Sequence, residues 1–255
     1  SSWSVAQHYG LTKLGAVAPG FQADLAILSD SQDCEVETVL KKGVPISELS
    51  LQKTVVGAVV NSIICEIPET TDLNGPDGKV HVIGVKPGKI ITDHLTMNHN
   101  AEGVARLSVL ERYGRNTKPA NGYVYGFGKT FRGAIASSVG HDSHNLIVVG
   151  RHLEDMRTAL AALKQSGGGF VVVEYGSVLA HLALPFGGLM TNEAPDQIVT
   201  KLRTLRAASK QVGCEIPEPF LQLAFLSLPV IPSLKLTDQG LVDVEQFKII
   251  DVRAA

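Results

Sequence analysis

The chain has 255 residues, 44% of them apolar, and its 23 Lys and Arg against 25 Asp and Glu leave a net charge of −2. This composition is typical of a folded core and argues against a disordered chain. It also argues against nucleic-acid binding, because proteins that bind the phosphate backbone cluster Lys and Arg. No stretch approaches the roughly 18 consecutive apolar residues of a membrane span, so we expect a soluble protein with no membrane partner.

The cysteines and the start of the chain bear on its context. Cys34, Cys65 and Cys214 are far apart and form no C-x-x-C pair. Neither a disulfide framework nor a zinc ribbon is therefore predicted, and a cytoplasmic location is expected. The chain opens at Ser1 without a charged and then apolar targeting segment, so we expect it to start inside a longer polypeptide.

The first 53 residues predict few elements. A helix end, a turn rich in Gly and Pro and a strand are predicted within 6–28, and a second strand at 36–41 turns into 44–46. An isolated pair of short strands is marginal in water. This segment is therefore expected to need strands from elsewhere.

From residue 54 onward the pattern predicts a longer series of strands, at 54–64, 79–85, 90–92, 104–110, 133–139 and 146–149. The stretch 104–110 alternates, with Ala105, Leu107 and Val109 on one face. A polar loop at 140–145 separates the last two strands of the series.

Helices follow this series. Amphipathic patterns predict helices at 153–165 and 196–212, and a hairpin is predicted about Gly176 between them. The apolar tail at 220–252 is interrupted by Pro and Gly and predicts short strands. Residues 54–255 therefore predict an α+β or mixed α/β domain with a mixed sheet.

The polar loop contains His141, Asp142, Ser143, His144 and Asn145. Its two imidazoles stand at H-x-x-H spacing with a carboxylate between them, and Zn, Mn or Fe accepts both ligand types. The loop is therefore a candidate metal or proton-transfer site, in which His141, Asp142 and His144 are candidate metal ligands. The alternative is a polar turn whose side chains cap the strand ends.

Other motifs carry weaker signals. His94 and His99 could add ligands to the same site, but solvated loop histidines are the commoner case. The glycine-rich strings at 126–130, 167–169 and 185–190 predict turns, because none has the spacing and strand-to-helix order of a phosphate-binding loop. No G-x-S-x-G string is present, so a serine hydrolase is not favoured.

Four strings together resemble the adenine deaminase family of the amidohydrolase superfamily, in the family's order and over nearly the whole chain. They are GAVAPGFQADL at 15–25, GAIASSVGHDSHNLIVVG at 133–150, LPFGGLM at 184–190 and LPVIPSLKLTDQGL at 228–241. The resemblance implies that residues 1–53 are the end of a (β/α)8 barrel and an incomplete part of a small β-sandwich. It implies that residues 54–255 are the family's C-terminal α/β domain.

The resemblance also implies an activity, the hydrolysis of adenine to hypoxanthine and ammonia. In the family a divalent metal, expected to be Mn, Fe or Zn, lies in the barrel and lowers the pKa of bound water. The family's barrel ligands begin with an H-x-H pair, and no H-x-H occurs in this chain. The catalytic barrel is therefore expected to be absent here, with adenine and the upstream barrel as partners of the parent protein and the isolated chain inactive.

Two alternatives remain open at this point. The domain could be a structural or oligomerisation module without chemistry, since the apolar segment 220–226 could bury against a second subunit. It could instead be a lid or regulatory module that binds a metal or purine-like ligand through the loop of His141 and His144. As a lid over the barrel, this loop could contact substrate, bind an ion of its own or hold a domain interface together.

Overall fold

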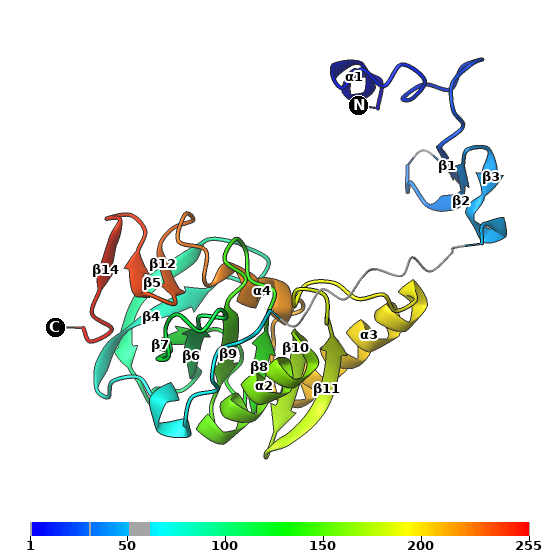
Figure 1. Ribbon diagram of the computed structural model, residues 1–255. Helices are drawn as coiled ribbons and strands as arrows, with labels where there is room; N and C mark the ends of the chain where they lie inside the picture. Colours follow the sequence, from blue (N-terminus) through cyan, green and yellow to red (C-terminus); the bar gives the residue numbers. More distant parts are fainter. Residues whose placement is uncertain (1, 31, 51–61, 255) are drawn as a thin grey trace. The chain divides into compact units, whose positions relative to one another are not determined.

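The computed structural model describes residues 2–30, 32–50 and 62–254, and the chain divides into two compact units, Ser1–Val55 and Val56–Ala255 (Figure 1). Residues 54–61 of the strand predicted at 54–64 lie outside the described residues, and 62–64 belong to no strand. Among the helices that are described, none is both long and apolar enough to cross a membrane. The assignment of 1–53 and 54–255 to particular domains of the family stays a prediction.

The first unit holds a small antiparallel sheet in the order β1-β2-β3. Its elements are α1 (Ser2–His8), β1 (Leu25–Leu28), β2 (Val36–Lys41), β3 (Val44–Pro45) and a 3-10 helix (Ile46–Glu48). Among the described residues of this unit, Ala6 is the one buried apolar side chain, whereas Ile27 and Val36 are 42% and 59% exposed. The sheet therefore has little core of its own.

An eight-stranded mixed sheet forms the centre of the second unit, in the order β11-β10-β8-β9-β6-β7-β4-β5 (Figure 1). The strands are β4 (Lys79–Val85), β5 (Thr92–Asn98), β6 (Val104–Leu110), β7 (Ala120–Tyr125), β8 (Ala134–Ser137), β9 (Leu146–Gly150), β10 (Gly169–Glu174) and β11 (Ser177–Ala183). Neighbouring strands are antiparallel except for β4 and β7, which are parallel. The described residues form no closed barrel, and the predicted mixed-sheet fold is confirmed.

Both faces of this sheet are covered. The remaining elements are a 3-10 helix (Thr70–Leu73), α2 (Leu153–Ser166), α3 (Pro195–Gln211), α4 (Pro219–Phe225), β12 (Leu234–Thr237), β13 (Gly240–Asp243) and β14 (Lys248–Ile250). In β9, Leu146 and Val148 pack into the core under α2, whereas Ile147 and Val149 pack into the core with α3, α4 and β12. Alternate side chains of one strand thus enter opposite cores, which makes this strand apolar throughout.

The structure confirms most predicted elements and corrects several. The helices α2 and α3, the β10–β11 hairpin and the inward face of β6 agree with the sequence patterns. The strand predicted at 90–92 begins only at Thr92, and β7 was not predicted. The strands predicted after residue 220 are wrong for α4, where Pro219 lies in the first helical turn and Phe220 and Leu223 are buried.

Candidate functional site

The predicted loop joins the adjacent antiparallel strands β8 and β9, whose pairing of Ser137 with Ile147 fixes its two ends. Within it, the backbones of Asp142 and His144 have φ values of +78° and +51°. Residues other than glycine rarely adopt this left-handed region of backbone conformation. Such strain persists only where surrounding contacts impose it. Contacts with surrounding residues therefore hold the loop in this conformation.

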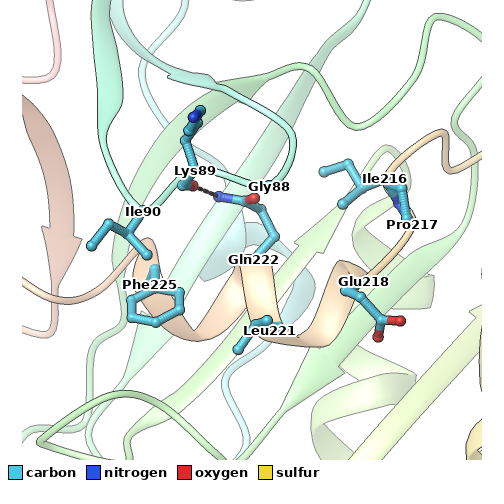
Figure 2. A pocket seen from close by; sticks show the side chains of 9 residues that line it. All are labelled: Gly88, Lys89, Ile90, Ile216, Pro217, Glu218, Leu221, Gln222 and Phe225. Atoms are coloured by element: carbon cyan, nitrogen blue, oxygen red, sulfur yellow. Dashed lines mark hydrogen bonds between the residues drawn. The ribbon is translucent and has the colours of Figure 1, made fainter. Parts of the chain in front are cut away.

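Helix α4 fixes the first histidine of the loop. The backbone N–H of His141 donates to the Ala224 carbonyl over 3.1 Å, and its ring stacks on Phe225 with centroids 5.3 Å apart and planes 25° apart. Phe225 also lines an apolar pocket of about 150 Å³ with Ile90 and Leu221 (Figure 2). His141 itself is exposed.

Asp142, Ser143 and Asn145 line a polar hollow of about 650 Å³. Its other walls are Glu111, Tyr113, Arg115, Asn116, Asp238 and Gln239. Asn145 is buried and already committed, because its Nδ2 donates to Asp238 over 3.0 Å and its Oδ1 accepts from the Arg112 backbone N–H. Asn145 therefore bridges two segments, whereas Asp142 and Ser143 are exposed to solvent.

Arg112, which the sequence patterns did not single out, lies directly beneath this loop. Its Nη1 donates to the His144 carbonyl over 2.9 Å, and its Nη2 donates to Ser62 Oγ and to the Gly187 carbonyl, each over 2.7 Å. The side chain is 2% exposed, and burial lowers the pKa of its guanidinium. A charged residue two positions after the buried strand β6 was the available signal.

His144 is partly buried beside Arg112. Its Nδ1 is buried without a hydrogen-bond partner in the described structure. Burial lowers the pKa of this imidazole, and the charges of Arg112 and His141 lower it further. At neutral pH the ring is therefore neutral, so it presents one N–H donor and one nitrogen acceptor.

Two of the glycine-rich strings, at 167–169 and 185–190, pack beside Ser138 at the base of the loop, whereas the string at 126–130 packs against Gly213 and Glu215. Ser138 follows β8, and its Oγ donates to the Gly188 carbonyl over 2.6 Å and accepts from the Gly169 N–H over 2.7 Å. At Gly188, φ is +72° and a Cβ would lie 2.5 Å from Nη2 of Arg112. Glycine is thus needed here for close packing.

The other candidate histidines lie elsewhere in this unit's fold. His94 is in β5 rather than in a loop, and its Nε2 lies 2.9 Å from Nδ1 of His81. His99 Nδ1 accepts from the Gly78 N–H over 2.8 Å. The interpretation of His94 as a loop histidine is therefore wrong, because the alternating strand continues through it.

The donor set for a metal is incomplete in the described part of the chain. Over residues 2–30, 32–50 and 62–254, no three His, Cys, Asp or Glu side chains are grouped so that they could hold a metal ion. Zinc sites in proteins are formed by three or four such ligands. The assignment of His141, Asp142 and His144 as metal ligands stays a prediction.

Comparison with known proteins identifies the family to which the chain is similar. The model of the family described as "Adenine deaminase C-terminal domain" matches residues 85–248 of this chain. The chain is 42% identical to adenine deaminase of Shewanella halifaxensis (strain HAW-EB4), over 99% of this chain and 45% of that protein. It is 42% identical to adenine deaminase 1 of Rhizobium etli, over 98% of this chain and 46% of that protein. It is 43% identical to adenine deaminase of Brucella suis biovar 1, over 98% and 45% respectively.

These alignments show to which family the chain belongs and how much of each relative it covers. The chain spans less than half the length of the curated relatives it matches. The strings that suggested the resemblance, the loop at 140–145 among them, lie mostly inside the matched domain. The chain therefore belongs to the adenine deaminase family and corresponds to its C-terminal region.

Proposed function

We propose that this chain is the C-terminal part of a cytoplasmic, metal-dependent enzyme that hydrolyses adenine to hypoxanthine and ammonia. The observation that carries the proposal is the 42% identity over 99% of the chain to a protein called adenine deaminase. That relative is more than twice the length of the matched region. Adenine and an upstream catalytic barrel are the partners that this assignment proposes.

The metal of the parent enzyme, proposed as Mn, Fe or Zn, belongs to the part of the protein outside this chain. Two observations support this division: the sequence has no H-x-H pair, and the described residues offer no grouped ligand set. We derive no reaction step through the metal from this chain. What the chain contributes is the loop at 140–145.

The loop is suited to contact a polar substrate. Asp142 and Ser143 are exposed beside a polar hollow, and the imidazole of His144 is neutral at neutral pH. A purine base presents ring nitrogens that accept and an exocyclic amine that donates, which these groups complement. The loop is therefore the proposed contribution of this domain to substrate binding in the parent enzyme.

The structural alternative is less well supported. In the apolar segment 220–226, Phe220, Leu223 and Leu226 are buried within the second unit, and Leu221 is 59% exposed. Most of the segment's apolar surface is thus already used inside this unit. The homo-oligomer stays a prediction that no contact described here supports.

The isolated chain is expected to release no ammonia from adenine, because the proposed catalytic metal site lies outside it. The measurement is ammonia release by purified chain loaded with Mn, Fe or Zn, beside the full-length protein as positive control. The matched control is the chain carrying His141→Ala and His144→Ala. Metal-dependent release from the chain above that variant would overturn the proposal that the chain is inactive alone.

A further inference from the structure

Arg112 joins three segments that are far apart in the sequence. Its guanidinium donates to the carbonyl of His144 in the loop, to the carbonyl of Gly187 in a glycine-rich turn, and to the hydroxyl of Ser62. Its backbone N–H also donates to the side chain of Asn145 over 3.3 Å. Arg112 thus contacts both His144 and Asn145, the last two residues of the loop.

The charge of Arg112 makes this arrangement unusual. The side chain is 2% exposed, and none of the carboxylates in the described residues forms an ion pair with it. Its Nε is buried without a hydrogen-bond partner in the described structure. A buried charge without a counter-ion is costly, and an apolar side chain of similar volume would fill the space at lower cost. Packing alone therefore gives no reason for an arginine here.

The contacts of Arg112 show what the guanidinium achieves. Its planar, fork-shaped set of donors reaches several acceptors at fixed angles, which an ammonium group does not reproduce. One of these acceptors is the carbonyl of His144, whose own backbone has the unfavourable φ of +51°. The bond therefore opposes relaxation of this residue to a commoner conformation.

We propose that Arg112 is the positioning residue of the 140–145 loop, holding the strained backbone of His144 against the turn at Gly187. It acts through the loop and touches no reacting atom. This inference rests on the proposed function, since the loop matters for catalysis only if the parent enzyme uses it. The hydrogen bonds themselves predict an effect on the loop that does not depend on activity.

The test uses the full-length protein with Arg112→Ala and Arg112→Lys. Arg106→Ala is the matched control, because Arg106 lies in β6, which leads to Arg112, and likewise donates to a backbone carbonyl, that of Arg151, over 3.0 Å. Three readouts are needed: hydrogen exchange of the peptide covering 140–146, kcat and KM for adenine, and the change in both on adding guanidinium ion well below denaturing concentrations. Thermal unfolding of each variant reports whether it is folded.

For Arg112→Ala we expect faster exchange at 140–146 and a loss of about 100-fold in kcat/KM, the scale of a misplaced active-site group. Guanidinium ion should restore part of the loss, and Arg112→Lys should fall between the alanine variant and the wild type. A purely structural role predicts equal losses for Arg106→Ala and no rescue by guanidinium ion. That result, or unchanged exchange at 140–146 in a folded Arg112→Ala protein, overturns the proposal.

The exchange readout separates this inference from the proposed function. If the wild-type full-length protein releases no ammonia from adenine, the proposed function fails. Faster exchange confined to 140–146 in Arg112→Ala would then still establish the positioning contact. If the wild type is active and Arg112→Ala keeps both normal exchange and normal kcat, the positioning role alone is wrong.

Discussion

Replacing Gly169 with alanine should lower the free energy of unfolding by about 4 kcal/mol or more, at the severe end of single substitutions. Gly169 begins β10, has a φ of +136°, and a Cβ there would lie 1.9 Å from the Leu182 carbonyl oxygen of the paired strand β11. Its N–H and carbonyl also bond to Ser138. Relief of the clash must therefore break the β10–β11 pairing or the contact to Ser138, and denaturation in urea measures the cost.

Gly176 provides the matched control for this substitution. It also has a positive φ, +72°, but no atom lies within 4 Å of the position a Cβ would take. Gly176→Ala should therefore cost only about 1 to 2 kcal/mol, the conformational strain of an L residue in this region. Equal urea midpoints for the two variants would show that the close approach at Gly169 does not limit stability.

Lys235 should make the free energy of unfolding of the second unit increase as the pH rises. Its side chain is fully buried in β12, its Nζ donates to the Ile90 carbonyl over 2.9 Å, and burial lowers its pKa from 10.5 to about 8. Between these two pKa values the unfolded chain binds more protons than the folded chain, so stability rises with pH. Over this window the gain is about 3 kcal/mol.

Comparison with Lys235→Met isolates this contribution. The raised pKa values of Cys214 and Tyr123 oppose the trend at high pH, but both proteins share them. The free energy of unfolding of the wild type, minus that of Lys235→Met, should therefore rise between pH 7 and 11. Lys89→Met, which removes an exposed lysine, should keep the wild-type profile. A pH-independent difference for Lys235→Met would contradict the assigned pKa.

Sequence patterns predicted the helices and strands in which buried apolar residues recur at a regular spacing. The alternation in 104–110 indicated which side chains of β6 enter one core, and the structure places Ala105, Leu107 and Val109 together there. The helix α4 could not be distinguished from a strand, because a short apolar run is compatible with both. The strand β7 contains Asn121 and Gly122, which are typical of turns, and it exists because β4 and β6 pair with it.

The candidate site shows the same limit. The loop at 140–145 was recognisable because its polar residues interrupt two apolar strands. Arg112 was not, because its contacts arise from the pairing of β6 with β9 and from the turn at Gly187, which lies 75 positions away in the sequence. The stacking of His141 on Phe225 likewise depends on a helix that the sequence pattern did not predict.

The most direct test of the account measures adenine hydrolysis by the full-length protein with Asp142→Asn and His144→Asn together. Asparagine tolerates the left-handed backbone of both positions, so the loop should keep its conformation while losing the carboxylate and the imidazole. His8→Asn with Asp33→Asn, an exposed pair in the first unit, is the control. We predict a loss of about 100-fold in kcat/KM for the loop variant and none for the control. A folded loop variant with wild-type kcat/KM would contradict the proposed role of this domain in the reaction.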